Sequence, residues 1–382
     1  KAQFNLGVIY HNGEKGILQK DNKKAVKYYS MAASKGLAKA QFNLGVLYSK
    51  GDEDIPVDKK MAAQLFQLAA DQGDSDAQLN LGAMYAKGEG VEKVDKQKTA
   101  ELYKKAAKQG NPKAQFNLAV MHSKGDGIPK NYKKAVKYYQ KASDQDISQA
   151  SFNLGVIYFR GAEGVEEDKT KAAELFEKAA ELNPKNSKAL FNLAIMNMKG
   201  EGVDKDEGKA LDYFEKAAEL DNKDALLNLG MIYMEGGCGV EPNKKKAFSY
   251  YERAALLGND KAQLNLGIML QNGEGCEKDL EKAKEMFQLS ADQGNPQAQI
   301  NLGLLLIGRD DEIKEAQKKQ LEESAEKGNI ESMYELGCKY QEDDDIENAV
   351  KWFSKAAANE NSKAQLELGK IYLYGKQTEV DL

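Results

Sequence analysis

A six-residue phrase that the chain repeats constrains its fold most strongly. Residues 2–7 read Ala-Gln-Phe-Asn-Leu-Gly, and the same letters return at residues 40–45. Altered copies follow at intervals of 32 to 39 residues, and they begin at Ala77, Ala114, Ala150, Ala189, Ala225, Ala262, Ala298, Ser332 and Ala364. Repetition with such a period marks a solenoid, whose small units are stabilised by stacking on their neighbours. We therefore predict a long binding surface and not an enclosed reaction vessel.

Composition supports one continuous repeat array over residues 1–382, although the length alone would suggest two or three globular domains. A net charge of −5 argues against nucleic-acid binding and general membrane-surface binding. No apolar run reaches the roughly 18 residues of a membrane span, so we expect no direct membrane insertion. The array starts inside the repeated phrase at Lys1 and stops at Gly375, where a further loop would begin. We expect a fragment of a longer chain.

Each repeat predicts two helices joined by a glycine loop. In residues 114–150, apolar residues recur at helical spacing up to about Lys124, and Gly-Asp-Gly-Ile-Pro at 125–129 then breaks the pattern. A second helix is expected from about Tyr132. We name the two helices helix A and helix B. Most helices B should end at a glycine in a left-handed cap, and these glycines are Gly36, Gly73, Gly110, Gly258, Gly294 and Gly328.

Small residues indicate how helices A and B touch. Glycine in a helix interior costs about 1 kcal/mol relative to alanine, yet one position of helix A is almost always glycine. Its members are Gly7, Gly45, Gly82, Gly155, Gly230, Gly267, Gly303, Gly337 and Gly369, with Ala119 and Ala194 as the substitutes. Helix B carries alanine at the position expected to face it, as at Ala25, Ala62 and Ala172. A close-packed antiparallel pair follows.

These motifs resemble the Sel-one-like repeat (SLR), a branch of the tetratricopeptide superfamily with longer units. The resemblance covers the whole chain and is most specific at the Gly-Glu-Gly loops of residues 88–91, 200–203 and 273–276. It implies an all-α fold, a right-handed α/α superhelical solenoid of about ten helix-loop-helix repeats. It also implies that helix A lines a concave groove and that the protein serves as a scaffold or adaptor for other proteins.

Two departures from the family pattern stand out. The last two full units, about residues 298–363, have shortened interhelix loops at 307–310 and 341–345 and are more tetratricopeptide-like. Acidic runs at 310–312 and 343–345 are expected to cap helices B there. The chain also lacks the two cysteines per repeat of the disulfide-rich bacterial members, which argues against an extracellular role and against the penicillin-binding activity suggested for them.

The first candidate site is an asparagine ladder on helix A. Asparagine is a mediocre helix former, yet nine occupy one register: Asn5, Asn43, Asn80, Asn117, Asn153, Asn192, Asn228, Asn265 and Asn301. By resemblance this position faces the groove, where an amide can both donate to and accept from a peptide backbone. The alternative is architectural: each asparagine bonds a neighbouring helix and holds the repeat spacing.

The second candidate is a basic row at the end of helix A. Five consecutive repeats place a cation in one register: Lys50, Lys87, Lys124, Arg160 and Lys199. Together with the ladder asparagines, the row could clamp an acidic peptide or a C-terminal carboxylate. Alternatively, the cations only complement the negative end of the helix dipole, for about 0.3–1 kcal/mol each.

The third candidate is apolar. A hydrophobic row beside the ladder, exemplified by Phe42, Phe152 and Ile300, is expected in the core or on the ligand surface. Further along helix A, apolar residues replace the polar ones of other repeats and could form a local partner patch. These residues are Phe159, Met198, Met234 and Ile307.

Catalytic, cofactor and metal sites are poorly supported. The chain has two histidines, and no cysteine or histidine pair has zinc-like spacing. The glycine loops lack Gly-Lys-Ser/Thr and are interpreted as hinges. We therefore expect no enzyme, no cofactor and no metal site.

The sequence thus favours a non-enzymatic scaffold in which helix A presents a groove to partner proteins or peptides. Membership of a larger complex is compatible with this role. Three alternatives stay open: a regulatory subunit of a membrane enzyme, a structural brick in a large assembly, and the recruiting arm of an enzyme whose catalytic domain lies elsewhere. Cysteines without an evident partner and the absence of Asn-x-Ser/Thr favour the cytoplasm.

Overall fold

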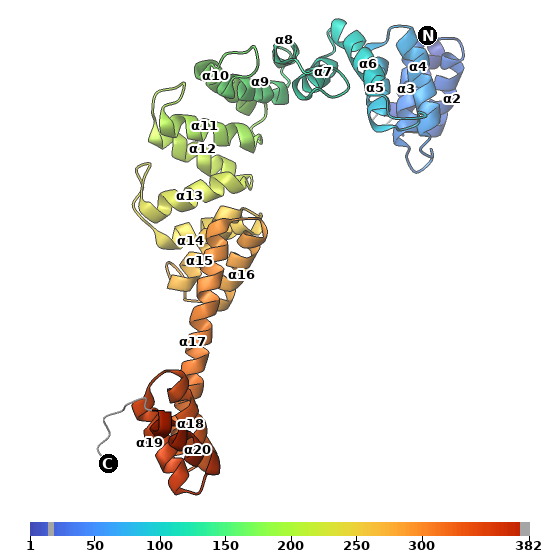
Figure 1. Cartoon of the computed structure of the whole chain (residues 1–382). Helices are drawn as coiled ribbons and strands as arrows, with labels where there is room; N and C mark the ends of the chain where they lie inside the picture. Colours follow the sequence, from blue (N-terminus) through green and yellow to red (C-terminus); the bar gives the residue numbers. More distant parts are fainter. Residues whose placement is uncertain (14–18, 375–382) are drawn as a thin grey trace. The chain divides into compact units, whose positions relative to one another are not determined.

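The computed structural model describes residues 1–13 and 19–374, and these form twenty α-helices (Figure 1). Residue contacts divide the chain into two compact parts, Lys1–Leu257 and Gly258–Leu382. We call them the N-terminal part and the C-terminal part. In both, each helix packs on the next along the chain, as expected of repeats that bury their apolar faces against their neighbours. The predicted α/α solenoid is confirmed.

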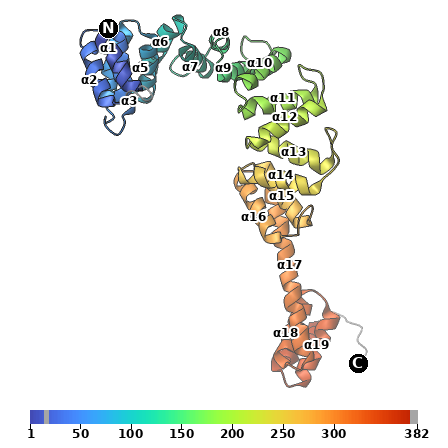
Figure 2. The same cartoon turned by 180° about the vertical axis from the view of Figure 1, so that it is seen from behind.

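Odd-numbered helices of the N-terminal part are helices A, and even-numbered ones are helices B. The helices A are α1 (Ala2–Asn12), α3 (Ala38–Lys50), α5 (Ser75–Lys87), α7 (Pro112–Lys124), α9 (Ser148–Arg160), α11 (Ser187–Lys199) and α13 (Lys223–Glu235). The helices B are α2 (Asn22–Ala33), α4 (Lys59–Asp71), α6 (Lys96–Lys108), α8 (Tyr132–Ser143), α10 (Lys169–Leu182), α12 (Glu207–Glu219) and α14 (Lys244–Leu256). Figure 2 shows successive pairs such as α11–α12 and α13–α14 as neighbours.

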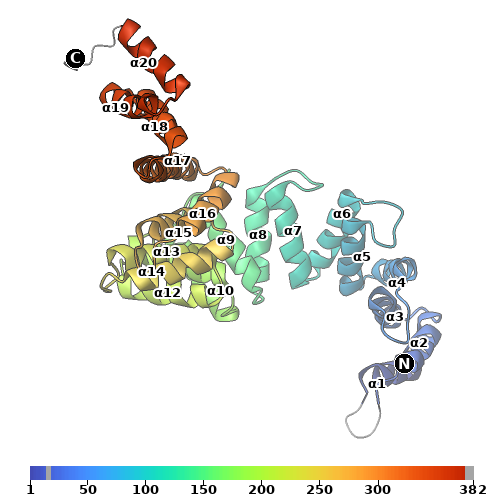
Figure 3. The ribbon, with the colours of Figure 1, turned by 90° about the horizontal axis from the view of Figure 1, so that it is seen from below.

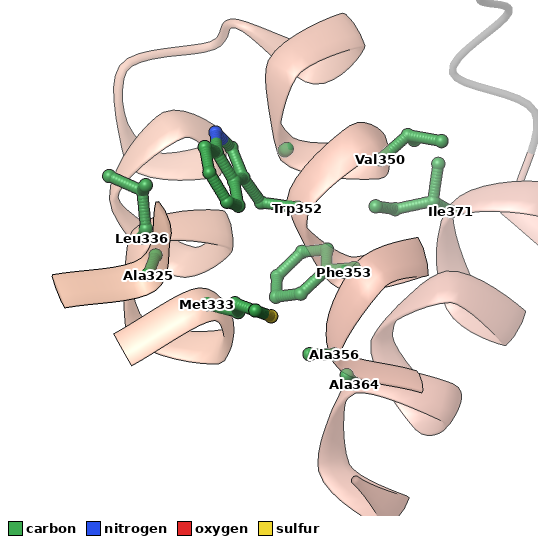
Figure 4. Packing of buried hydrophobic residues seen from close by; sticks show 10 residues of the cluster. Ala325, Met333, Leu336, Val350, Trp352, Phe353, Ala356, Ala364 and Ile371 are labelled. Carbon is green, nitrogen blue, oxygen red and sulfur yellow. The ribbon is translucent and has the colours of Figure 1, made fainter. Parts of the chain in front are cut away.

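The C-terminal part holds six helices. They are α15 (Asp260–Asn272), α16 (Leu280–Asp292), α17 (Pro296–Glu326), α18 (Ile330–Glu342), α19 (Ile346–Ala358) and α20 (Ser362–Tyr374). Helices α15 and α16 form an A/B pair and lie side by side (Figure 3), as do α18 and α19. Around Phe353, the side chains of Met333, Leu336 and Ala325 close a core that joins α17, α18 and α19 (Figure 4).

Local chemistry explains why the helices start and stop where they do. Helices B begin after an Asp or Asn whose side chain accepts a backbone N–H of the first turn, as Asp168 does from Lys171 at 2.9 Å. Helices A such as α5 and α7 end at glycines in the left-handed region, Gly88 and Gly125. The glycines that follow helices B also have positive φ, for example 91° at Gly73. The predicted end of the first helix near Lys124 and the predicted start of the second near Tyr132 are confirmed.

In seven repeats, the near-constant glycine of helix A lies against an aromatic ring of helix B. A Cβ at Gly45 would lie 2.8 Å from the Phe66 ring, and one at Gly155 would lie 2.8 Å from the Phe176 ring and 3.3 Å from the carbonyl oxygen of Ala172. The facing alanines, including Ala62 and Ala172, are fully buried. Close packing was predicted correctly at the seven covered glycines, although the covering ring was not foreseen. It was predicted wrongly at Gly303 and Gly369, where a Cβ would meet no described atom within 4 Å.

One predicted loop is wrong. Helix α17 runs without a break through residues 307–310, where the sequence suggested a connection, and through 310–312, where it suggested a helix cap. The loop that follows α15 begins with two glycines of positive φ, Gly273 and Gly275. The corresponding part of α17 has only Gly308, which keeps helical φ, so nothing redirects the chain. The second short loop is confirmed, because α18 ends at Glu342 and Asp345 caps α19.

Candidate functional site

Two hollows open between consecutive helices A in the middle of the N-terminal part. Lys124 of α7 and Asn153 and Arg160 of α9 line the first, of about 360 Å³. Phe159 and Arg160 of α9 and Asn192 of α11 line the second, of about 550 Å³. The hollows share Phe152, Val156 and Arg160 and therefore form one surface. We call this surface the helix A groove and define it by Lys124, Asn153, Phe159, Arg160 and Asn192.

The first hollow has a one-sided charge. None of the described residues that line it is acidic, whereas Lys124 and Arg160 both contribute cations. A similar hollow of about 450 Å³ lies among α1, α3 and α5, and there Asn43, Lys50 and Asn80 meet without an acidic residue among the described lining. A hollow with this lining attracts anionic groups. The second hollow of the helix A groove has mixed charge, because Asp221 and Asp224 line it together with Arg160, Lys188 and Lys223.

Some ladder asparagines bond a tyrosine of the preceding helix B. Asn153 donates from Nδ2 to the Tyr139 hydroxyl at 3.3 Å, and the side chains of Asn43 and Asn117 hydrogen bond Tyr29 and Tyr103. Burial raises the pKa of these tyrosines above the usual value, so the hydroxyls are neutral near pH 7. For this group the architectural interpretation of the ladder holds in part.

Other ladder asparagines follow a phenylalanine, which offers no hydroxyl. Asn80 and Asn228 follow Phe66 and Phe214. Among the described residues, their side chains donate only within their own helices, to the carbonyl oxygens of Asp76 at 2.8 Å and Asp224 at 2.7 Å. Asn192 follows Phe176, and no described residue hydrogen bonds its side chain. The carboxamide of Asn192 therefore remains available in the helix A groove.

A glutamine ladder holds neighbouring repeats together, and sequence reasoning missed it. Gln78 is buried, donates from Nε2 to the carbonyl oxygen of Ala70 at 3.1 Å and accepts from Gln109 at 2.9 Å. Gln41, Gln115 and Gln263 are buried at the same position, and each accepts in the same way from the glutamine that follows a helix B. The glutamine at the second position of the repeated phrase could have predicted this ladder.

The cations of the basic row are the last residues of their helices A. Lys87, Lys124, Arg160 and Lys199 are exposed, and none forms an ion pair with a described acidic residue. Lys124 and Arg160 meet in the first hollow, whereas Lys87 and Lys199 lie outside both hollows of the groove. The structure thus brings together two of these four cations.

The apolar candidates separate in the same way. The Phe159 ring lies 6.4 Å from the Phe176 ring and lines the second hollow. Met198 and Met234 are half-buried on α11 and α13 and line neither hollow. The hydrophobic row mostly packs on helix B, as shown by the ring pairs Phe42–Phe66, Phe116–Tyr139, Phe152–Phe176, Phe191–Phe214 and Tyr334–Phe353.

A larger hollow of about 1020 Å³ lies among α4, α5 and the loop before α6, and no sequence motif predicted it. Its lining includes Gln67 and Leu68 of helix B and Tyr85 of helix A. Leu68 is 52% exposed. This exposed leucine on helix B was the sequence feature that could have indicated the hollow.

Within the described residues, no three His, Cys, Asp or Glu side chains are placed to hold a metal ion. A search of the same residues finds no helix with the length and apolar character needed to span a membrane. All three cysteines are free thiols.

Comparison with known proteins gives a family and a fold. The Sel1 repeat family matches residues 1–37, 38–74, 75–111, 112–147, 148–184, 187–222, 223–259, 260–295, 330–361 and 362–382. Residues 296–329, which contain α17, are not matched. No curated protein matches the chain.

Two solved structures resemble the whole or most of the chain. A protective antigen of uropathogenic Escherichia coli strains, which displays an SLR fold, is 32% identical over 100% of this chain and 81% of its own, with a TM-score of 0.73. A Sel1 repeat protein from Oxalobacter formigenes is 32% identical over 80% of this chain and 86% of its own, with a TM-score of 0.63.

Proposed function

Since the chain belongs to the Sel1 repeat family, we propose that it is a non-enzymatic scaffold whose helix A groove binds an extended acidic segment of a partner protein. Sel1 repeat proteins are generally protein-interaction scaffolds, and their solenoid is typically non-catalytic. The finer proposal concerns the groove and the chemistry of its ligand.

The charge of the first hollow carries the proposal. Lys124 and Arg160 line the same hollow without an acidic neighbour in its described lining, and neither forms an ion pair with a described residue. If the cations served only the helix dipole, their shared opening into one hollow would be incidental. An Asp or Glu side chain or a C-terminal carboxylate is the complementary ligand, and the Arg160 guanidinium can bind it through two N–H groups.

The amides and the ring supply the rest of the recognition. The Asn192 carboxamide can donate to a peptide carbonyl and accept from a peptide N–H, which suits a backbone of any sequence. Phe159, half-buried beside it, offers an apolar contact for a ligand side chain. Backbone recognition with a charge preference fits an extended acidic peptide.

Selection from a displayed library of random peptides tests the proposal. The whole chain is the bait, and the selected peptides are then measured against two charge-matched variants. One carries Lys124→Glu and Arg160→Glu, and the control carries Lys104→Glu and Lys137→Glu on the exposed side of helices B. We expect selected peptides to be rich in Asp and Glu and to bind the groove variant at least about tenfold more weakly.

The control variant should keep the affinity of the native chain, because its two lysines lie outside the groove. Peptides without acidic residues would contradict the proposal. So would equal losses of affinity in both variants, since these would reflect net charge alone.

A further inference from the structure

Helix α17 leaves uncovered a face that the other repeats cover. In seven repeats, the helix A glycine lies under a Tyr or Phe ring of helix B; a Cβ at Gly267, for example, would lie 2.6 Å from the Phe287 ring. A Cβ at Gly303 of α17 would meet no described atom within 4 Å. The hydrogen-bonded helix continues instead of turning back, so its own helix B does not cover it.

The residues around Gly303 occupy the positions that hold the ring in other repeats. The residue three before the glycine contacts the helix B ring in α3, where the Phe42 and Phe66 centroids are 5.8 Å apart and the rings are tilted by 42°. The residue four after it does so in α9, where Phe159 and Phe176 are 6.4 Å apart. In α17 these positions are Ile300 and Ile307, which are 56% and 61% exposed. We call Ile300, Gly303, Leu306 and Ile307 the α17 apolar face.

The chain's own covering residue cannot reach this face. The ring residue of helix B lies seven positions before the glycine that follows the helix, as Phe287 does before Gly294, and this register assigns Leu321 to Gly303. In one straight helix, Gly303 and Leu321 are about 27 Å apart along the axis. Leu321 packs instead on the core of α18 and α19.

Side-chain contacts hold that second half of α17 on α18. Tyr340 donates from its hydroxyl to Glu322 at 2.5 Å, and Lys318 donates to Asp343 at 2.7 Å. The Lys318 ammonium also lies 3.9 Å from the centre of the Tyr340 ring. The residues that could fold back are therefore engaged elsewhere.

We propose that the α17 apolar face binds an amphipathic helix of a partner protein, antiparallel to α17, with a Phe or Tyr ring over Gly303. The other A/B pairs define this partner: alanine stands four residues before the ring and a small residue three after it, as Ala283, Phe287 and Ser290 do in α16, where all three are buried. Packing an amphipathic helix into an apolar groove is a common mode of recognition.

A second copy of the chain is a poorer occupant. The helices B that carry such a ring already cover the glycine of their own repeat, and Leu321 of a second copy is engaged with its own α18. A separate helix with a free ring face is the complementary ligand.

The probe is a fluorescent peptide with the sequence of α16, residues 280–292, stapled between the exposed positions Glu281 and Glu285 because short isolated helices are marginal in water. Binding is followed by fluorescence anisotropy in a chain that carries Leu366→Asp. This background removes a second uncovered face on α20, where Gly369 has no described atom within 4 Å of a built Cβ and Leu366 is 60% exposed.

Gly303→Leu should fill the recess and weaken peptide binding at least about tenfold, without lowering the melting temperature, because the added atoms meet open space. The peptide change Phe287→Ala should have a similar effect. Gly267→Leu, which drives a side chain into the Phe287 ring, is the matched control that should lower the melting temperature.

Four results would overturn the proposal. They are no saturable binding, binding insensitive to Gly303→Leu, a melting temperature that Gly303→Leu lowers as Gly267→Leu does, and a dimer that Gly303→Leu converts to a monomer. The third result would mean that the chain covers the face itself, and the fourth that a second copy does.

Discussion

The hydroxyl that distinguishes tyrosine from phenylalanine on helix B changes what the next asparagine can do. Asn153 donates to Tyr139, whereas Asn80 faces Phe66 and bonds only its own helix. Spacing between repeats rests on a different side chain, because buried Gln78 bridges α4, α5 and α6. Identical asparagines in one register thus divide into bonded and available members.

Replacement of Gln78 and Asn80, two residues apart, separates architecture from recognition. We expect Gln78→Ala to lower the free energy of unfolding by about 1–3 kcal/mol, because it removes two hydrogen bonds, one to the Ala70 carbonyl, which keeps the Gly73 N–H, and one from Gln109. Asn80→Ala should leave the free energy of unfolding unchanged or raise it by a few tenths of a kcal/mol, which is about the gain in helix propensity. Urea unfolding of both variants measures this. Equal losses would make both ladders architectural.

His122 makes stability depend on pH. It stands where other repeats carry Tyr48, Tyr85 or Tyr158, its ring stacks on Tyr138, and its buried Nδ1 has no hydrogen-bond partner among the described residues. Burial, with a smaller contribution from Lys134, lowers the pKa of His122 in the folded chain. The unfolded chain then binds the proton first as pH falls below about 6.5.

We therefore expect the His122 contribution to stability to be complete above about pH 6.5 and to decline as pH falls from there toward the lowered pKa of the folded state. His122→Tyr removes this titration. The difference in unfolding free energy between His122→Tyr and the native chain should shift in favour of the variant between pH 7.5 and 5.5. A difference that is constant with pH would contradict the lowered pKa.

Each A/B pair depends on how closely a ring approaches helix A. In the pair α9–α10, the Phe176 ring and the Ala172 carbonyl lie against Gly155, while Ala119 and Ala194 show that two repeats accommodate one methyl group there. The size of the side chain at this position should therefore set the stability of the pair.

Gly155→Ala should change the free energy of unfolding by no more than about 1 kcal/mol, because the gain in helix propensity offsets a small ring shift. Gly155→Leu should cost about 1–3 kcal/mol or more through overpacking. Thermal and urea unfolding of the two variants give the comparison. A Leu variant as stable as the native chain would show that the pair has room at Gly155.

Sequence periodicity was sufficient to predict most elements. The end of α7, the start of α8, the left-handed glycines after helices B and the small-residue contact in seven repeats all followed from spacing and residue type. Helix α17 did not, because an interhelix loop was assumed from the repeat although residues 307–310 contain one glycine and no proline. The repeat register predicted a loop there, whereas the local residue types favoured a helix, and the backbone is helical.

The whole molecule turns equivalent positions of successive repeats into one surface. Sequence register could place Lys124, Asn153 and Arg160 on helices A, and the structure joins them in a single hollow. Register alone could not show that Lys87, Lys199, Met198 and Met234 lie outside the groove. The repeat period does not specify which members of a row line the same hollow.

Site-specific photo-crosslinking tests the central claim, that the helix A groove holds the partner. The photoreactive amino acid p-benzoylphenylalanine replaces Phe159 in the groove or, as a control, the exposed Lys137 on α8. After irradiation in the cells that make the protein, crosslinked peptides are identified by mass spectrometry. We expect the Phe159 position to capture an acidic segment of a defined protein, and Lys124→Glu with Arg160→Glu to abolish the crosslink. Capture of the same protein from position 137 but not from position 159 would contradict the account.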